Sequence, residues 1–359
     1  MQNTNPKTKR ILFDCERMKY PHTGLYHFCL QLGQALLRNM DGTKIKMSFY
    51  MPDKSGKLFG SKASYISQNS FHKLLFPSVK MFDIWHASYQ GSRYVPSDNN
   101  IKKVLTIHDL NFLYEHETRT EKIKRSLKKI QTDINRADKI CTISQYVKND
   151  VQEHLNVKDK EIEVIYNGCN ITDIENPQLP AEPPGQPFIF TLGTIMHKKN
   201  FHVLPALLRN NKLQLLIAGR RKKKEDQNKI KEEAAKHGVA DRVIFTGSVS
   251  DNDKKWYLQN CEAFVFPSIA EGFGLPVIEA MAFGKPVFLS TATSLPEIGG
   301  EVAYYFRSFD ADDMQQTFRK GMEHYNAYNP AEAIIKRALS FNWDNAAKKY
   351  LSLYKLLCS

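Results

Sequence analysis

The chain has 359 residues, of which 42% are hydrophobic and 25% charged, the composition of an ordinary globular protein. This length predicts two domains, because one domain usually holds roughly 100–200 residues. No apolar run approaches the roughly 18 residues that a membrane-spanning helix needs, and the polar, basic N-terminus is unlike a signal peptide. The six cysteines form no Cys-x-x-Cys pair and no cluster with His at zinc spacing. We therefore expect a reduced, cytoplasmic protein without a structural metal.

The formal net charge of +13 suits a polyanionic partner: nucleic acid, an anionic membrane surface or a phosphorylated substrate. Two segments concentrate basic residues, 220–224 and 119–129. Neither is interleaved with stacking aromatic side chains, and no nucleic-acid-binding motif accompanies them, so we expect no nucleic-acid partner. Two alternatives stay open, a solvated face and contact with an anionic membrane surface through the helix at 119–129.

The first half of the chain alternates short apolar strands with amphipathic helices. A strand is predicted over 11–13, a helix follows from Gly24, and a strongly charged helix is predicted over 120–136. Further strands are predicted over 45–50, 82–86, 104–108, 140–143 and 162–166. Strands separated by helices indicate a parallel sheet that is covered on both faces.

A proline-rich segment interrupts this alternation. Residues 176–187 hold five prolines, so neither a helix nor an interior strand is expected there. The alternation then restarts, with strands predicted over 188–192, 213–218, 243–246, 263–266 and 287–289. Helices are predicted over 200–209, 225–237, 252–259, 275–283, 331–339 and 345–357. Two α/β units with parallel sheets follow from this pattern.

The pattern therefore predicts two doubly wound α/β domains, and ligands of such sheets bind at the carboxyl ends of the strands. We place a first domain at 1–178, a Pro-rich linker at 179–187 and a second domain at 188–340. The C-terminal helix, 341–359, is expected to cross back and pack towards the first domain.

The most informative stretch is 267–287, which reads PSIAEGFGLPVIEAMAFGKPV. Its Gly-Phe-Gly loop lets the backbone approach a ligand closely, and Leu275 opens a helix whose free N–H groups offer an anion site. Glu271 on the loop and Glu279 on the helix can face one pocket. A carboxylate accepts paired hydrogen bonds from vicinal hydroxyls, so Glu279 suits a ribose. Glu271 suits a sugar hydroxyl or a developing positive charge.

This stretch resembles the signature of glycosyltransferase family 4, in which two Glu, separated by seven residues, flank Gly-Phe-Gly-Leu-Pro. Other segments resemble the family in its order and spacing: TIHDL at 106–110, SQYVKNDV at 144–151, VIYNG at 164–168, LGTIMHKKN at 192–200, LLIAGR at 215–220, FTGSVSD at 245–251, LPEIGG at 295–300 and FNWDNAAKKY at 341–350. The resemblance implies two facing Rossmann-like domains, the GT-B architecture. It also implies transfer of a sugar from a nucleotide-sugar, with retention of configuration and without a metal.

The resemblance assigns residues to the donor. Lys199 matches the lysine that grips the donor diphosphate, and Glu279 would bind the ribose hydroxyls. Lys198 stands where related members usually carry Arg, so a bidentate phosphate contact is lost there. The contacts to the transferred sugar and phosphate would come from Glu271, as a catalytic residue, and from Gly272, Phe273, Gly274 and Leu275.

Two positions in the first half also match the family. His108 matches a histidine that contacts the donor sugar and helps to stabilise the transition state. Gly24 matches the N-terminal glycine loop that faces the diphosphate, although the family often carries more glycines there. The implied mechanism is front-face attack, in which the acceptor hydroxyl enters beside the departing diphosphate. Lys198, Lys199 and helix N-termini would stabilise that leaving group.

Each of these residues also has a structural interpretation. Glu271 and Glu279 could be a helix cap and a solvated helix residue, and His108 could be a core histidine at a strand end. The two lysines could be surface residues, and Gly24 a plain turn glycine. Asp251-Asn252-Asp253 resembles a metal-binding Asp-x-Asp motif, but it follows Ser250, a good N-cap, and is expected to be the first turn of a helix.

The expected function is that of a retaining, metal-independent hexosyltransferase that needs no cofactor. TIHDL at 106–110 and the loop spacing resemble mannosyltransferases of surface-polysaccharide assembly, which favours GDP-mannose over UDP-glucose as the donor. A saccharide or lipid-linked acceptor in polysaccharide or lipopolysaccharide synthesis is implied, with a cytoplasmic location at the inner face of the membrane. The alternatives are a nucleotide-sugar epimerase of the same architecture and a non-catalytic basic binding protein.

Overall fold

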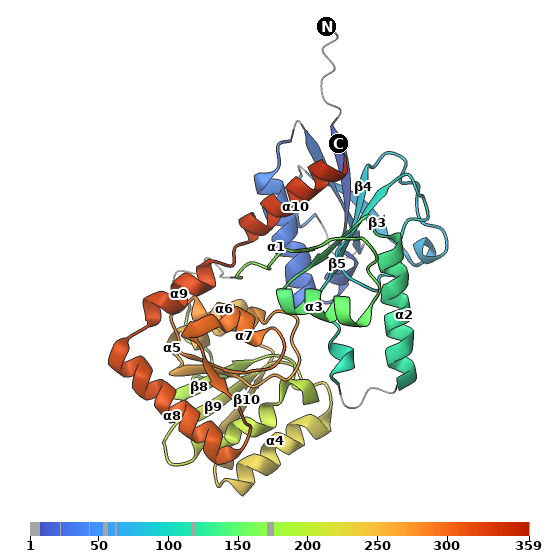
Figure 1. Ribbon diagram of the computed structural model, residues 1–359. Coiled ribbons are helices and arrows are strands. Elements are labelled where there is room, and N and C mark those ends of the chain that lie inside the picture. Colours follow the sequence, from blue (N-terminus) through green and yellow to red (C-terminus); the bar gives the residue numbers. More distant parts are fainter. Residues whose placement is uncertain are drawn as a thin grey trace. The chain divides into compact units, whose positions relative to one another are not determined.

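The computed structural model describes residues 8–21, 23–42, 44–52, 57–61, 63–115, 120–170 and 176–358 (Figure 1). The chain forms two compact units. The first comprises Met1–Leu113, Glu117–Gly168 and Asn342–Ser359, and the second comprises Tyr114–His116 and Cys169–Phe341.

The first unit is built on a seven-stranded sheet with the order β3-β2-β1-β4-β5-β6-β7, in which neighbouring strands pair in parallel. The strands are β1 (Lys9–Asp14), β2 (Ile45–Pro52), β3 (Ser64–Gln68), β4 (Ile84–Ala87), β5 (Lys102–Ile107), β6 (Lys139–Thr142) and β7 (Ile162–Val164). In β1, an interior strand, Ile11 pairs with Met47 on one side and with Ile84 on the other. All three of these side chains are buried, so the centre of the sheet is apolar.

Helices accompany this sheet in the alternation that the sequence predicts. They are α1 (Gly24–Asn39), α2 (Thr120–Arg136), α3 (Gln145–His154) and α10 (Trp343–Leu357), with the 3-10 helices η1 (Glu16–Lys19), η3 (Ser70–Lys73) and η4 (Asn111–Leu113). Side-chain caps fix where two of them begin. The Thr23 hydroxyl accepts from the N–H of Tyr26, and the Ser144 hydroxyl accepts from the N–H of Val147.

A buried polar network ties α10 to the sheet of the first unit. The two ring nitrogens of His86, in β4, lie 2.6 Å from the Tyr354 hydroxyl and 2.8 Å from the Thr106 hydroxyl. Thr106 lies a further 3.0 Å from the hydroxyl of Tyr350. Burial lowers the pKa of His86 to about 3, so the imidazole is neutral and one nitrogen must accept a hydrogen bond.

We expect Tyr354→Phe to lower the free energy of unfolding by about 1–2 kcal/mol, because it leaves one buried nitrogen of His86 without a partner. Urea unfolding measures this change. Tyr328→Phe is the matched control, because Tyr328 is largely exposed and its hydroxyl can bond to water. Equal stability of both variants would show that the network does not hold α10.

The second unit contains a six-stranded parallel sheet with the order β10-β9-β8-β11-β12-β13. The strands are β8 (Phe188–Leu192), β9 (Gln214–Ala218), β10 (Val243–Gly247), β11 (Ala263–Phe266), β12 (Val287–Ser290) and β13 (Tyr304–Phe306). The helices are α4 (Lys224–Lys236), α5 (Asp251–Asn260), α6 (Leu275–Met281), α7 (Leu295–Gly299), α8 (Ala311–Tyr328) and α9 (Ala331–Leu339). The 3-10 helices are η5 (His197–Lys199), η6 (Phe201–Leu208), η7 (Ala240–Arg242) and η8 (Gly300–Val302).

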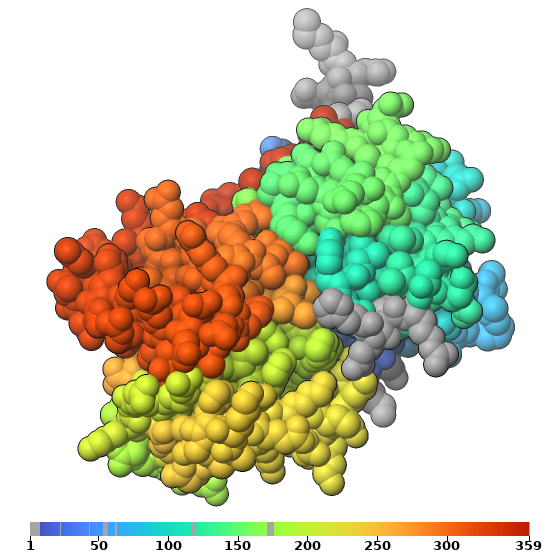
Figure 2. Space-filling model, turned by 60° about the horizontal axis from the view of Figure 1, so that its bottom comes forward, coloured from blue at the N-terminus to red at the C-terminus, as the bar shows by residue number. Residues whose placement is uncertain are grey.

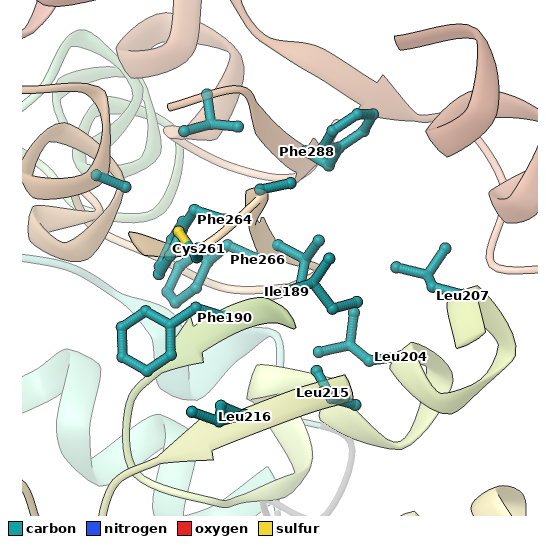
Figure 3. Packing of buried hydrophobic residues seen from close by; sticks show 14 of the residues in the cluster. Ile189, Phe190, Leu204, Leu207, Leu215, Leu216, Cys261, Phe264, Phe266 and Phe288 are labelled. Carbon is teal, nitrogen blue, oxygen red and sulfur yellow. The ribbon is translucent and has the colours of Figure 1, made fainter. Parts of the chain in front are cut away.

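The core of the second unit lies on both faces of its sheet. In Figure 3, Ile189 lies on the side of Leu204, which belongs to η6, whereas Phe190 and Leu216 lie on the other side. All four side chains are buried. A sheet that carries apolar side chains on both faces must be covered by helices on both faces, as a doubly wound sheet is.

The sequence analysis predicts most elements within two residues, with several exceptions. The helix expected over 200–209 is the 3-10 helix η6, which contains Pro205 and therefore lacks one backbone donor. The elements β3, β13, α3, α7 and α8 are absent from the sequence-based assignment. The Pro-rich segment 179–187 lies within the residue range of the second unit and is not a separate linker between the units.

Helix α10 belongs to the first unit, where it packs against α1.

Candidate functional site

The loops that follow β8 and β11 are bonded to each other at the carboxyl edge of the second sheet. The first loop contains η5, which carries Lys198 and Lys199. The carbonyl oxygen of Lys198 accepts from the N–H of Ile269 at 2.9 Å and from the hydroxyl of Ser268 at 3.1 Å. Because β8 and β11 are neighbours in the sheet, segments 70 residues apart in sequence meet here.

A partly buried ion pair lies at this junction. The Lys199 ammonium contacts a carboxylate oxygen of Glu271 at 2.5 Å, and the hydroxyl of Ser268 donates to the same oxygen at 2.6 Å. The ammonium also lies 4.7 Å from the centre of the Phe266 ring, within cation–π range. The structure therefore brings together Lys199 and Glu271, two residues that the sequence analysis selects separately.

The carboxyl of Glu271 is held ionised. Burial pushes its pKa upward, but Lys199 and Lys198, with the hydrogen bonds from Lys199 and Ser268, outweigh burial and lower the pKa below its ordinary value. The Lys198 ammonium itself lies 3.8 Å from a carboxylate oxygen of Glu115. Two ammonium groups and an ionised carboxylate are thus concentrated at one sheet edge.

The loop after Glu271 has a fixed backbone. The N–H of Glu271 donates to the Thr293 hydroxyl at 2.9 Å, and the Ser294 hydroxyl lies 3.0 Å from the carbonyl oxygen of Glu271 and 3.2 Å from that of Phe273. Gly274 has φ +105°, and a Cβ there would lie 3.1 Å from Leu295. A glycine is therefore required at this turn, where α6 begins at Leu275 as predicted.

Glu279 is a buried residue of α6, so the alternative of a solvated helix residue is wrong for it. A carboxylate oxygen lies 3.3 Å from the ammonium of Lys254, which also lies 3.8 Å from Asp251. Burial raises the pKa of Glu279 above its ordinary value, while Lys254 and a hydrogen bond with Asn170 oppose that rise.

Two glycines that the sequence analysis did not select complete this edge. A Cβ on Gly219, after β9, would lie 1.9 Å from the carbonyl oxygen of Gly193, after β8. Gly193 has φ +155° and lies against the side chain of Lys199. A Cβ added at Gly193 would lie 3.4 Å from Lys199 Cε. These glycines let the loops approach each other closely, and their presence in LGTIMHKKN and LLIAGR was the signal available in the sequence.

In the first unit, His108 lies at the carboxyl end of β5 and is buried. Its Nε2 lies 2.8 Å from the carbonyl oxygen of Ser88, which can only accept, so Nε2 carries the proton and Nδ1 the lone pair. Its ring meets that of Phe28 edge to face at 4.5 Å. Burial lowers the pKa of His108 to about 4, so the imidazole is neutral at pH 7.

Gly24 is the first residue of α1, directly after the N-cap Thr23. A Cβ at Gly24 would meet no atom within 4 Å, so packing does not require a glycine. Gly24 can therefore be interpreted either as a residue that lets a ligand approach the backbone or as a plain glycine at the start of a helix.

The sequence analysis also passed over Asp14, a buried carboxyl at the end of β1. One of its oxygens accepts from the N–H of Glu16 at 2.9 Å. Burial, assisted by the charge of Glu16, raises the pKa of Asp14 to about 7. Only its position after an apolar strand could have indicated it.

We expect Asp14→Asn to stabilise the protein at pH 8 by about 4 kcal/mol and to change little at pH 4. Between the ordinary pKa of 3.8 and the folded value of about 7, only the folded protein keeps this proton. The contribution of the Asp14 carboxyl to the free energy of unfolding therefore falls as the pH rises from 3.8 to about 7. Asparagine does not ionise, so the variant does not lose this stability. Urea unfolding of both proteins from pH 4 to 8 measures it, and a constant difference across the range would contradict the assignment.

Comparison with known proteins identifies the family. The sequence model described as "Glycosyl transferases group 1" matches residues 173–339, and the model described as "Glycosyltransferase Family 4" matches residues 41–173. Together they cover most of the chain and include every candidate site residue except Gly24. The chain belongs to the group 1 glycosyltransferases.

This group 1 glycosyltransferase has curated relatives and a similar solved structure. The O-antigen chain mannosyltransferase B of Escherichia coli is 24% identical, over 97% of this chain and 100% of the relative. A serotype-specific mannosyltransferase of Escherichia coli is 30% identical, over 75% of this chain and 35% of the relative. A glycosyltransferase structure from Rickettsia africae aligns with a TM-score of 0.75 at 17% identity, covering 98% and 99% of the two chains. These matches confirm the family resemblance and the GT-B fold.

Within the described ranges, no group of three or more His, Cys, Asp and Glu side chains could hold a metal ion. The Ser250 hydroxyl accepts from the N–H of Asp253 and caps α5, as predicted.

No helix in the part of the chain that the structure describes is both long and apolar enough to cross a membrane.

Proposed function

We propose that this protein transfers a hexose from a nucleotide-sugar to a saccharide or lipid-linked acceptor, with retention of configuration and without a metal. The observation that carries the proposal is the Lys199–Glu271 pair beside Lys198 at the carboxyl edge of the second sheet. Relatives named as O-antigen chain mannosyltransferases favour GDP-mannose as the donor, with UDP-glucose next, and a role in surface polysaccharide or lipopolysaccharide synthesis.

The lysines would stabilise the leaving group. Breaking the sugar–phosphate bond places negative charge on the departing diphosphate, and Lys198 and Lys199 are the ammonium groups fixed at this edge. Glu271, which is held ionised by Lys199, would accept a hydrogen bond from the sugar or face the positive charge that develops at the anomeric carbon. The backbone of Gly272, Phe273, Gly274 and Leu275 would contact the sugar and phosphate.

Glu279 would bind the ribose. Its carboxylate is buried, and one oxygen is oriented by Lys254 at 3.3 Å. A fixed carboxylate can accept from both vicinal hydroxyls of a ribose, which a deoxyribose cannot match.

For the first unit we propose that His108 contacts the transferred sugar as a neutral hydrogen-bonding group. With its pKa near 4 it is not a proton donor at neutral pH, but Nδ1 can accept from a sugar hydroxyl. Gly24 would let the backbone of α1 approach the diphosphate, because no side chain fills that space.

An anionic membrane surface is a proposed partner through helix 119–129, with the protein in the cytoplasm. The described part of this segment lies in α2, where Lys122, Lys124 and Lys128 provide positive charge. The basic segment at 220–224 leads into α4, which is drawn in yellow on the open surface of the second unit in Figure 2.

A nucleotide-binding panel tests the proposed function. The thermal midpoint is measured with GDP, UDP, ADP, dTDP and their sugar conjugates, with magnesium or with EDTA. A ligand at 100 times its Kd adds about 2.7 kcal/mol of stability, which is readily detected. One nucleotide that shifts the midpoint equally in EDTA supports the proposal. No shift with any of them would contradict it.

A further inference from the structure

One stretch of the first unit exposes large apolar side chains. Phe71 is 66% exposed, Leu74 86%, Leu75 69% and Met81 58%. They lie in the connection between β3 and β4, drawn in light blue beside those strands in Figure 1. We call residues 69–81 the 69–81 surface. Clustered exposed apolar side chains mark an interaction site more often than isolated ones do.

The 69–81 surface has a fixed conformation. Nδ1 of His72 lies 2.9 Å from the Tyr50 hydroxyl, and the Phe76 ring packs on Tyr50 at 5.1 Å and on Trp85 at 5.2 Å. Val79 is buried beneath the stretch. These inward contacts anchor the segment to the sheet, so the four apolar side chains are held outward by the fold.

Lysines accompany these apolar side chains in the sequence. The sequence holds no acidic residue between Asp53 and Asp83, whereas it holds five lysines there. Two of them, Lys73 and Lys80, lie within the 69–81 surface and are exposed. A surface that combines exposed Leu, Phe and Met with lysines is complementary to an anionic lipid bilayer, whose headgroups attract the ammonium groups while the acyl boundary takes the apolar side chains.

We propose that the 69–81 surface inserts into an anionic lipid bilayer and holds the protein at the membrane. Two copies of this surface facing each other would bring like charges together, which disfavours a second copy of the chain as the occupant. The inference is independent of the proposed sugar transfer, because it concerns residues that the donor site does not use.

The basic helix α2 differs from this surface. It has lysines, but none of the large hydrophobic side chains exposed in the described residues lies between Thr120 and Arg136. Helix α2 can therefore attract anionic lipid by charge, whereas the 69–81 surface provides both charge and insertion. Salt should therefore weaken membrane binding through α2 more completely than binding through the 69–81 surface.

Vesicle flotation tests the proposal. The purified full-length protein is mixed with vesicles of phosphatidylcholine alone, or of phosphatidylcholine with phosphatidylglycerol. We expect binding to the anionic vesicles, weakened at least about tenfold in Leu74→Gln/Leu75→Gln, because burying a leucine contributes roughly tenfold or more. Lys73→Gln/Lys80→Gln should weaken binding by about tenfold as well and flatten its salt dependence. The control, Leu179→Gln/Leu339→Gln, changes two leucines of the second unit that are also more than half exposed, and it should bind as the wild type does.

Three results would overturn the proposal. Binding that survives Leu74→Gln/Leu75→Gln but is lost in Lys122→Gln/Lys124→Gln/Lys128→Gln would assign the membrane contact to α2 alone. A wild type that binds no vesicle but forms a dimer that Leu74→Gln/Leu75→Gln dissociates would make the surface a self-association interface. Absence of both behaviours would also contradict the proposal. Hydrolysis of the nucleotide-sugar in solution reports on the donor site separately and should be unchanged in Leu74→Gln/Leu75→Gln.

Discussion

Lys199→Met is expected to lower kcat/KM for sugar transfer by about 100–1,000-fold, because it removes a fixed positive charge from the position proposed for the departing diphosphate. Steady-state release of the nucleoside diphosphate measures the loss. Lys212→Met is the matched control. Lys212 is exposed and precedes β9, at the amino edge of the same sheet, so its loss should leave the rate within about twofold.

Stability separates this catalytic effect from a structural one. Lys199→Met also leaves the largely buried Glu271 carboxylate without its ammonium partner, which should lower the free energy of unfolding by about 3 kcal/mol. Adding Glu271→Gln removes the unpaired charge, so the double variant should recover most of that stability while remaining inactive. Recovery of both stability and activity in the double variant would contradict a role for Lys199 in the reaction.

Glu279→Gln is expected to raise the Kd of the preferred nucleoside diphosphate by about 10–100-fold, since hydrogen bonds to a charged acceptor contribute about 1.5–3 kcal/mol. Isothermal titration calorimetry measures the change. Acid should act in the same direction in the wild type, because the ionised carboxylate is the form that accepts from ribose. With the pKa of Glu279 raised, affinity should decline at a higher pH than for an ordinary glutamate, and the Gln variant should lack this decline.

The sugar of the nucleotide provides the sharper control. If Glu279 bonds the vicinal hydroxyls, the wild type binds the ribonucleotide more tightly than its 2′-deoxy form, and Glu279→Gln abolishes that preference. Glu301→Gln, on an exposed residue of the same unit, should preserve it. A preference that persists in Glu279→Gln would show that Glu279 ties α6 to α5 through Lys254 and does not contact ribose.

Local pattern was sufficient to predict many elements from the sequence. The helix over 120–136 was predicted with the bounds that the structure gives, because its charged face and apolar positions repeat at the helical period. The cap at Ser250 was predicted for a similar reason. The strand β3 was missed because it is only partly buried and has no continuous apolar run. The strand β13 was missed because it has only three residues.

Contacts between residues far apart in the chain could not be predicted from the spacing of residues in the sequence. Lys199 and Glu271 are 72 residues apart, and their contact depends on β8 and β11 being neighbours, which periodicity does not reveal. The raised pKa of Asp14 has the same origin, since it reflects burial by segments distant in sequence. The family resemblance supplied the candidate site residues, while the structure supplied the partners that fix their charge.

The central claim is that this protein transfers a sugar without a metal and with retention. The most direct measurement incubates GDP-mannose and, in parallel, UDP-glucose with the purified protein and a panel of saccharide acceptors in EDTA, and determines the anomeric configuration of any product by NMR. We predict a product with the donor's α-configuration, formed at the same rate in EDTA and in magnesium. A β-linked product, or transfer that magnesium alone restores, would contradict the account.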